Sequence, residues 1–395
     1  MFAHRLIPFC LLLFIVALSG CNTSTAQESG DIPDVTTKRA TELDRVIPEI
    51  MNTHGVNTTG VGVIKNGVLV WTGYYGEQSA GVPASKETLF NVASITKTIT
   101  AEAILHMVED GQLDLDESMA PYWVDPDLEQ DPRHTTLTPR MTLNHSTGFL
   151  NWRNMHDDRK LQFVNDPGTT FGYSGEGIEY LMRYAQRKSG AHPEELVKKY
   201  VFDPMGMTGV SYSVRNANFE RIAKPKDENG REYDPYCRPG GFCGQEGRYF
   251  ASDDMVITVE SYAKFLISVM NEEGLSKEII ADRNRVQVTK PADQRVVDCT
   301  MDVDQTCPDA QGYGLGWEVL DYGDTKVLSH SGSDWAELTL GYVYTNSKDG
   351  LIIFFNAPNE LAVRAMLDTL LLMDSDSPMI GGYRRWITWL ESQGK

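Results

Sequence analysis

Residues 89–111 read LFNVASITKTITAEAILHMVEDG and carry the strongest structural signal in the chain. An apolar segment, residues 89–93, leads into a helical pattern that runs over residues 94–110 and is closed by Gly111. Inside this pattern, Ser94 and Lys97 form an S-x-x-K sequence. Side chains three residues apart share one face of a helix, so the Lys97 amine can reach the Ser94 oxygen.

The start of a helix is a suitable place for a nucleophilic serine. The positive end of the helix dipole favours an alkoxide at Ser94 and, later, an oxyanion beside it. A buried Lys97 amine could then take the proton of a hydroxyl that is otherwise a poor nucleophile. The plain alternatives are a helix-capping serine and a solvated lysine. Because S-x-x-K recurs at residues 261–264 and 392–395, the motif needs support from other segments.

A second candidate group is Tyr173, which lies in the glycine- and proline-rich stretch PGTTFGYSGEG at residues 167–177. This composition predicts a loop from which the phenol can project. A tyrosinate next to an ammonium group is a competent general base. The alternative is an ordinary, half-buried loop aromatic.

A third candidate group, His330-Ser331-Gly332, enters a late strand pattern. Gly332 would allow a substrate backbone to approach the strand edge closely. The backbone N–H of Ser333 could pair with that of Ser94 as an oxyanion hole. The alternative is a surface strand with a solvated histidine.

These motifs, in this order, resemble the serine β-lactamase and penicillin-binding-protein group, above all the class C β-lactamase-like hydrolases. The matching stretches are FNVASITKTITAEAILHMVEDGQLDLDE (90–117), LTPRMTLNHSTGF (137–149), PGTTFGYSGEG (167–177), GYGLGWEV (312–319) and SHSGSDWAE (329–337). The resemblance implies that Ser94 is the acylated nucleophile and that Lys97 and Tyr173 share the proton shuttle. It implies hydrolysis of an ester or amide, in a small molecule or a peptide, with no metal and no cofactor.

Two departures from the family pattern bear on the substrate. Gly175 stands where Tyr-x-Asn members have an asparagine that contacts the substrate amide, and His330 stands where β-lactamases usually have lysine. Both changes favour an esterase or a peptidase, including one acting on cell-wall peptide, over a dedicated β-lactamase. Asp334 and Trp335 replace small residues and are expected to narrow the acyl pocket. A class C-type β-lactamase and a non-catalytic envelope binding protein that retains the fold remain the alternatives.

The order of patterns along the chain predicts an α+β fold. Strand patterns lie at both ends and helix patterns lie between them, so we expect one antiparallel sheet built from both chain ends, with flanking helices and an inserted, mainly helical region at about residues 112–310. The expected elements are a helix at 38–54, a hairpin at 61–73 turning at Asn66-Gly67, strands over 326–357, and helices at 360–373 and 383–390. Together they form one hydrolase domain, residues 38–395.

The N-terminal residues predict export. Residues 1–20 have a short basic start and an apolar stretch, and the sequence LSGC that ends at Cys21 is a lipobox. We therefore expect a lipoprotein signal peptide, a lipidated Cys21 and a flexible tether over residues 21–37, with an ordinary cleaved signal as the alternative. Asn22 favours sorting to the outer membrane. The expected location is the bacterial envelope, with the lipid anchor in a membrane.

Charge and cysteine usage agree with an exported protein. The formal net charge of the 395 residues is −19, which disfavours nucleic acid as a partner. Four cysteines lie in two close pairs, Cys237 with Cys243 and Cys299 with Cys307, and predict two local disulfides. Zinc is the competing interpretation, although the spacings are unusual for zinc. Asp302, Asp304 and Asp309 could gather calcium, but a solvated acidic loop is the favoured interpretation.

Overall fold

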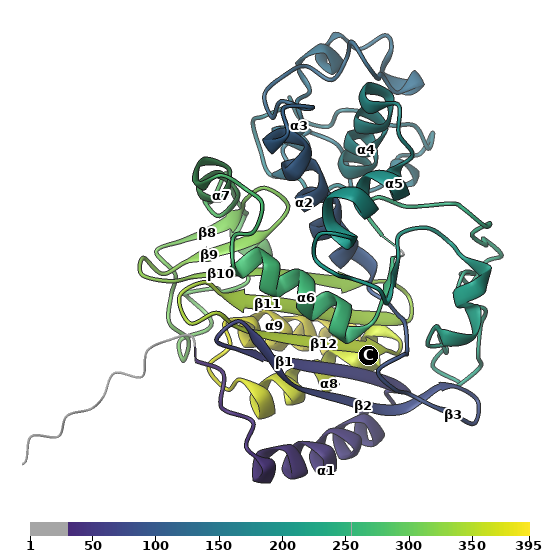
Figure 1. Ribbon diagram of the computed structural model, residues 1–395, viewed down its shortest axis with the longest axis vertical. Helices are drawn as coiled ribbons and strands as arrows, with labels where there is room; N and C mark the ends of the chain where they lie inside the picture. The colour runs from purple at the N-terminus through teal and green to yellow at the C-terminus, as the bar shows by residue number, and fades with distance from the viewer. Residues whose placement is uncertain (1–30, 254) are drawn as a thin grey trace, which may run out of the picture.

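A nine-stranded antiparallel sheet forms the middle of the molecule (Figure 1). The computed structural model describes residues 31–253 and 255–395, so the predicted signal peptide and Cys21 lie outside the described residues. The strand order is β3-β2-β1-β12-β11-β10-β9-β8-β7. The strands are β1 (Thr58–Lys65), β2 (Val68–Ser79), β3 (Val82–Pro83), β7 (Val288–Thr289), β8 (Ala310–Tyr313), β9 (Glu318–Asp321), β10 (Lys326–Ser333), β11 (Glu337–Tyr344) and β12 (Asp349–Asn356).

The sheet joins the two ends of the chain. Strand β1 lies between its hairpin partner β2 and the late strand β12, with a register that runs from Thr58 opposite Asn356 to Ile64 opposite Gly350. The hairpin turns at Asn66 and Gly67, whose φ angles of 50° and 75° are those that a tight hairpin requires. The predicted fold class, an antiparallel sheet assembled from both termini, is therefore confirmed.

Helices cover both faces of the sheet (Figure 1). On one face lie α1 (Thr37–His54), α8 (Asn359–Met373) and α9 (Met379–Ser392), and on the other lies α6 (Val259–Met270). The alternation of strand side chains explains this arrangement, because successive residues point to opposite faces. In β12, Ile353 and Phe355 belong to the core under α1, α8 and α9, whereas Ile352 and Phe354 belong to the core that includes α6.

The region between β4 (Phe90–Asn91) and β8 is mainly helical, and its packing brings distant segments beside Ser94. It holds α2 (Thr96–Glu109), α3 (Pro139–Leu143), α4 (Gly175–Ser189), α5 (Pro193–Val197), α6 and α7 (Lys277–Arg283). It also holds strands that the sequence pattern did not show: β7 in the large sheet, and β5 (Val210–Ser211) and β6 (Val256–Ile257), which form a small sheet with β4 in the order β4-β6-β5. Each has two residues, which is too short for a periodic pattern.

A buried ion pair joins two helices of this region, and a tryptophan next to the sheet bonds it. Glu102 of α2 and Arg283 of α7 are each 1% exposed and lie 3.1 Å apart. The indole of Trp317, at the start of β9, donates a second hydrogen bond to Glu102, with 2.9 Å between Nε1 and Oε1. Buried charges of this kind are tolerated only when they are paired and hydrogen-bonded.

The segment before α1 is packed against the sheet from Ile32 onward. Ile32 is 1% exposed, and its N–H donates to Asp349 at the start of β12. The Lys65 amine bonds both Asp349 and the Ile32 carbonyl. The tether predicted over residues 21–37 therefore ends before Ile32, because an apolar side chain and a charged strand end hold this segment in place.

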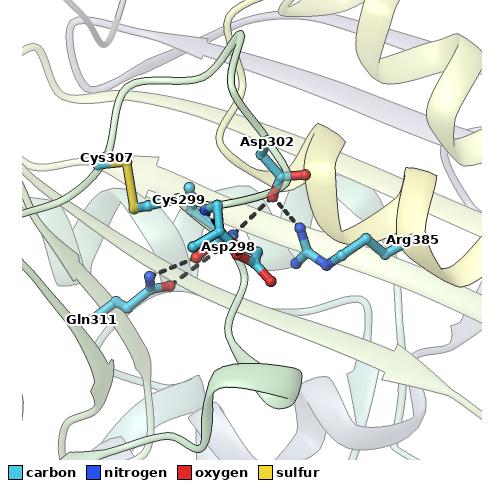
Figure 2. Close-up of a disulfide and its surroundings, with 8 residues drawn as sticks. Asp298, Cys299, Asp302, Cys307, Gln311 and Arg385 are labelled. Atoms are coloured by element: carbon cyan, nitrogen blue, oxygen red, sulfur yellow. Dashed lines mark hydrogen bonds and ion pairs between the residues drawn. A yellow bond between two sulfur atoms is a disulfide. The ribbon is translucent and has the colours of Figure 1, made fainter.

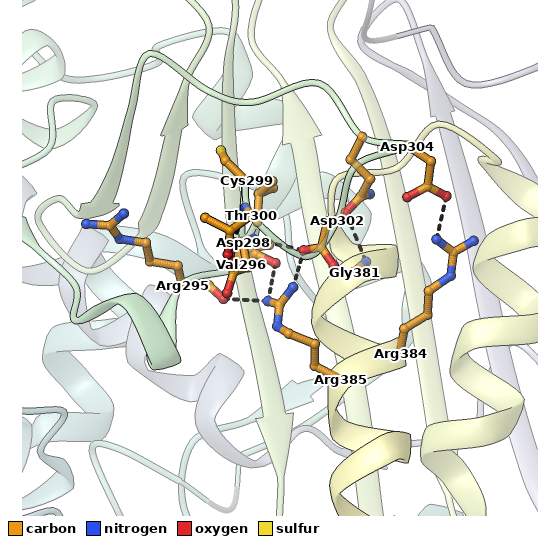
Figure 3. Close-up of polar contacts among 12 residues, drawn as sticks. Arg295, Val296, Asp298, Cys299, Thr300, Asp302, Asp304, Gly381, Arg384 and Arg385 are labelled. Atoms are coloured by element: carbon orange, nitrogen blue, oxygen red, sulfur yellow. Dashed lines mark hydrogen bonds and ion pairs between the residues drawn. The ribbon is translucent and has the colours of Figure 1, made fainter.

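The structure joins the cysteines in the two predicted pairs, Cys237–Cys243 and Cys299–Cys307. Figure 2 shows the second disulfide at the base of a loop whose Asp302 reaches Arg385 of α9. Figure 3 shows Asp304 of the same loop bonded to Arg384, with 2.6 Å between the two groups.

The acidic loop between Cys299 and Cys307 is not wholly solvated, as the sequence had suggested, because one of its aspartates is buried. Asp302 is only 6% exposed, and its carboxylate also accepts the backbone N–H of Asp298. Two of the three aspartates that could have gathered calcium thus bond arginines of α9. The loop fastens the last helix to the sheet. Across residues 31–253 and 255–395, no helix has both the length and the apolar character needed to cross a membrane.

Candidate active site

Ser94 lies in a tight helical turn, Ala93–Ile95, that leads directly into α2. Ala93 is buried and has a φ of 45°, an unfavourable backbone conformation for a residue with a side chain. The Asn91 side chain stabilises the turn by accepting the Ala93 N–H at 2.9 Å. Strain of this kind persists only where the surroundings enforce it, and it is common at functional sites. The turn fixes the Ser94 side chain at the N-terminal end of α2.

Lys97 is 1% exposed, and two hydrogen bonds fix its amine. The amine donates to Ser94 Oγ at 2.9 Å and to the Ser252 carbonyl at 2.7 Å. It also lies 4.9 Å from the centre of the Tyr173 ring. The spacing of three residues on one helix face thus brings amine and hydroxyl into direct contact.

A carboxyl group of α4 holds in place the residue that accepts a hydrogen bond from this amine. Glu179 Oε1 accepts the backbone N–H of Ser252 at 3.0 Å and its hydroxyl at 2.7 Å. Burial raises the pKa of Glu179, while the bonds from Ser252 oppose that rise. Glu179 and Ser252 were missed from the sequence, because 73 residues separate them and neither belongs to a recognisable motif.

Tyr173 stacks against a buried histidine. The centres of the Tyr173 and His145 rings are 4.4 Å apart, and His145 Nδ1 accepts the backbone N–H of Ser174 at 3.2 Å. Burial first, and then the charge of Lys97, holds the pKa of His145 well below its usual value, so the imidazole is neutral. His145 thereby fixes the backbone that carries Tyr173. The sequence marked His145 only as part of a family-like stretch.

Strand β10 approaches Ser94 at Gly332. A Cβ atom at Gly332 would lie 2.1 Å from the Val92 carbonyl oxygen and 3.1 Å from the Ser94 nitrogen. Gly332 is therefore needed for the approach of the chain's own nucleophile turn, and the expected approach of a substrate backbone stays a prediction. Strand β9 pairs with β10 only as far as Ser329, so within the described residues the edge of β10 from His330 onward has no strand neighbour on that side.

The side chains of β10 alternate between the two faces. His330 lies near Tyr173, with 6.3 Å between ring centres. Ser331 instead lines a separate cavity of about 180 Å³ beside Met379 and Tyr383 of α9. The expected substrate contact of Ser331 is thus limited to its backbone, because its hydroxyl faces the opposite side of the sheet. The same alternation leaves Ser333 its backbone N–H as the group available to an oxyanion.

His330 is a neutral imidazole in this site. Burial, followed by the charge of Lys97, lowers the pKa of His330 to about 3. Its Nδ1 lies 2.6 Å from the Ser331 carbonyl and donates to it, which leaves Nε2 as an acceptor. The site therefore lacks a cation at the position where lysine was expected in β-lactamases.

The position of Gly175 is covered by an indole. A Cβ atom at Gly175 would lie 2.6 Å from the Trp152 ring, so the ring fills the space that an asparagine side chain would need. The Gly175 N–H donates to Asn151 Oδ1 at 2.8 Å, which places the 151–152 segment against the start of α4. Trp152 was missed because only this close contact reveals it.

The Cys237–Cys243 loop reaches the same site from the other side. Arg238 forms an ion pair with Asp334 at 2.8 Å and lies 3.6 Å from Asp253. Asp334 directly follows Ser333, and Asp253 directly follows Ser252. Trp335 packs against Tyr233, with 5.1 Å between ring centres, which agrees with the narrowing expected for this end of the site. The cavity lined by Arg238, Asp334 and Trp335 has a volume of only about 30 Å³.

Most of the predicted site residues thus lie together. Ser94, Lys97, Tyr173, His330 and Gly332 converge from α2, the loop before α4, and β10. The Cys299–Cys307 disulfide lies in the loop that bonds α9 (Figure 2). The arrangement can activate a serine hydroxyl and presents backbone N–H groups beside it. This is the geometry that acyl transfer through serine requires.

Comparison with known proteins agrees with this chemistry. A family model described as Beta-lactamase matches residues 43–372. The chain is 28% identical to the lovastatin esterase of Penicillium rubens over 244 residues, which cover 52% of this chain and 61% of that protein. It is 30% identical to the human mitochondrial serine beta-lactamase-like protein LACTB over 118 residues, which cover 29% of this chain and 22% of that protein. The matches thus span less than two thirds of either relative.

The fold matches that of solved structures over most of its length. The octameric penicillin-binding protein homologue from Pyrococcus abyssi superimposes with a TM-score of 0.67 and 23% identity, covering 87% of this chain and 80% of that one. That likeness concerns the fold alone. The match to the family model spans most of the chain and includes Ser94, Lys97, Tyr173 and His330. The chain therefore belongs to the beta-lactamase family of serine hydrolases.

Proposed function

We propose that this protein is a lipid-anchored envelope hydrolase that cleaves esters, and secondarily amides, through an acyl-enzyme on Ser94. The contact of 2.9 Å between Lys97 Nζ and Ser94 Oγ carries this proposal, because it joins a buried amine to a hydroxyl at the start of α2. The name of the lovastatin esterase among the relatives agrees with ester chemistry.

The reaction proceeds in two steps. Ser94 Oγ attacks the carbonyl carbon, and its proton passes to the proton shuttle that Lys97 and Tyr173 form beside it. The backbone N–H groups of Ser94 and Ser333 stabilise the oxyanion. The leaving alcohol or amine takes up the proton, and water then attacks the acyl carbon and releases the acid from Ser94.

Two features of the site favour an ester over a β-lactam or a peptide. Gly175 has no side chain, and the Trp152 ring occupies the place where a side chain that binds an amide would be needed. His330 is neutral, so it offers no charge to a substrate carboxylate at this position. An ester requires neither contact, because its carbonyl needs only the nucleophile and the oxyanion donors.

The first test is time-resolved intact mass spectrometry of the protein mixed with p-nitrophenyl butyrate and, separately, with benzylpenicillin. We expect a butyryl adduct and the release of nitrophenol. In Ser94→Ala the adduct should be absent, and the rate of nitrophenol release should fall by at least about a thousandfold. Ser392→Ala is the matched control, because Ser392 also begins an S-x-x-K sequence but lies at the end of α9. Unchanged turnover in Ser94→Ala would place the active site elsewhere.

The penicillin arm separates the alternatives. A long-lived Ser94 adduct would indicate a penicillin-binding peptidase, and ring opening without a persistent adduct would indicate a β-lactamase. Turnover of neither compound by folded protein would favour the non-catalytic binding protein.

The envelope location has its own test. Palmitate labelling of the full chain in a bacterial host should mark the wild type and leave Cys21→Ser unlabelled. An unlabelled wild type would contradict the lipid anchor without affecting the chemistry at Ser94.

A further inference from the structure

A large cavity lies against α4 and shares two lining residues with the surroundings of the catalytic centre. It has a volume of about 830 Å³, within the usual range for small-molecule sites. Two of its lining residues belong to the site described above: Trp152, whose ring covers Gly175, and Glu179, which holds Ser252. A short series of hydrogen bonds, from Glu179 through Ser252 to Lys97, links the cavity wall to Ser94.

Four arginines line this cavity: Arg153, Arg183, Arg187 and Arg248. Arg153 forms ion pairs with Asp125, Asp127 and Glu176, so its charge is compensated. Arg183, Arg187 and Arg248 form no ion pair within 4.0 Å with a carboxylate among residues 31–253 and 255–395, although the charge of Arg183 acts to lower the pKa of Glu179, which lines the same cavity.

Helix α4 and the neighbouring aromatic rings set the positions of these three arginines. Arg183 and Arg187 are four residues apart on α4, so they share one face of that helix. The guanidinium carbons lie over aromatic rings: Arg183 over Tyr249 at 5.4 Å, Arg187 over Trp123 at 5.6 Å and Arg248 over Phe250 at 4.7 Å. Each ring offers an apolar surface next to the positive charge. This combination suits a ligand with an apolar or aromatic body and an anionic end.

We propose that this cavity binds the carboxylate-bearing end of the substrate, with the carboxylate on Arg183, Arg187 and Arg248 and the apolar body against Trp123, Tyr249 and Phe250. This inference rests on the proposed function and names its substrate class: an ester that carries a carboxylate distant from the scissile bond. The neutral His330 cannot supply carboxylate recognition on β10. The arginines on the opposite side of the site supply it instead, and guanidinium groups bind carboxylates through paired N–H donors.

The test measures binding and turnover separately. For binding, Ser94→Ala is titrated with 4-phenylbutyrate and with neutral 4-phenylbutanol, and isothermal titration calorimetry measures both affinities. We expect 4-phenylbutyrate to bind at least about tenfold more tightly than the alcohol at low salt, and the difference to shrink in 0.5 M salt. When Arg183→Ala and Arg187→Ala are added to the Ser94→Ala protein, the difference in affinity between the acid and the alcohol should disappear. Arg364→Ala, a change to a surface arginine of α8, should preserve it.

For turnover, p-nitrophenyl hexanoate is compared with the mono-p-nitrophenyl ester of adipic acid, which has a similar length and a terminal carboxylate. We expect a lower KM for the acidic ester in the wild type and a loss of that preference in the double arginine variant. Equal binding of acid and alcohol, or binding of neither, would overturn the inference even if both esters are hydrolysed. Tight binding of 4-phenylbutyrate without hydrolysis of either ester would preserve the cavity assignment and refute the proposed function.

Discussion

His330 is held neutral by its burial and by the nearby Lys97 charge, and this gives the folded protein a sensitivity to acid. An unfolded histidine titrates near pH 6.5, whereas the folded pKa is about 3. Between these values the unfolded chain binds more protons than the folded one. The stabilisation is therefore fully present above pH 6.5 and is lost as the pH falls towards 3. His145 acts in the same direction.

We expect His330→Asn to reduce this sensitivity. The loss of unfolding free energy between pH 7 and pH 5 should shrink by about 2 kcal/mol relative to the wild type. Urea unfolding at the two pH values measures it. His192→Asn is the matched control, because His192 is an exposed helix cap and asparagine also caps helices well. An equal loss in wild type and His330→Asn would mean that His330 is not buried as a neutral group.

The contact between Gly175 and Trp152 predicts a non-additive pair of substitutions. Gly175→Asn alone should destabilise the protein by about 1–3 kcal/mol, because the new side chain meets the indole at the first carbon. In the Trp152→Ala protein, Gly175→Asn should lower the unfolding free energy by roughly 1 kcal/mol less than it does in the wild type, or by a still smaller amount. Urea unfolding of the four proteins measures this coupling. Strict additivity would show that the ring does not occupy the asparagine position.

At the scale of elements, two disulfide loops of similar size have different neighbours. The Cys237–Cys243 loop carries Arg238, which bonds Asp334 beside Ser333, the residue proposed as an oxyanion donor. The Cys299–Cys307 loop bonds α9 instead (Figure 3). Replacing either pair by serines should cost about 2–3 kcal/mol of stability.

Only the Cys237→Ser/Cys243→Ser protein should also show a raised KM for ester substrates. The Cys299→Ser/Cys307→Ser protein serves as its control, and steady-state kinetics below the unfolding range makes the comparison. Equal KM values in both variants would show that the first loop does not shape the site.

The limits of prediction from sequence also lie at this scale. Ser94 and Lys97 could be predicted because they share one helix face, and Asn66-Gly67 identified a hairpin by local turn chemistry alone. Trp152 lies 23 positions before Gly175, and Arg238 is brought to Asp334 from a distant segment. Such contacts depend on how loops pack, and no periodic pattern encodes them. Two-residue strands such as β5 and β6 were missed for the same reason.

For the whole molecule, the Glu102–Arg283 pair joins α2 to α7, and the Trp317 indole connects the pair to the sheet. We expect Glu102→Ala to cost about 3–5 kcal/mol of unfolding free energy, because it leaves a buried guanidinium without its partner. Glu102→Gln should cost less, since the amide oxygen can still accept from Arg283 and from the Trp317 indole. Equilibrium unfolding of both variants checks this order. A near-neutral Glu102→Ala would show that water reaches this pair.

The pairing of β1 with β12 also sets the order of events during synthesis. At a translation rate of about 5–20 residues per second, the hairpin of β1 and β2 leaves the ribosome tens of seconds before β12 is made. An isolated two-stranded hairpin is only marginally stable. Until β12 is available, the chain exposes an apolar edge of β1 that a chaperone or a second nascent chain can bind. Although β1 is the first strand synthesised, it is thus among the last to have both of its neighbours in the sheet.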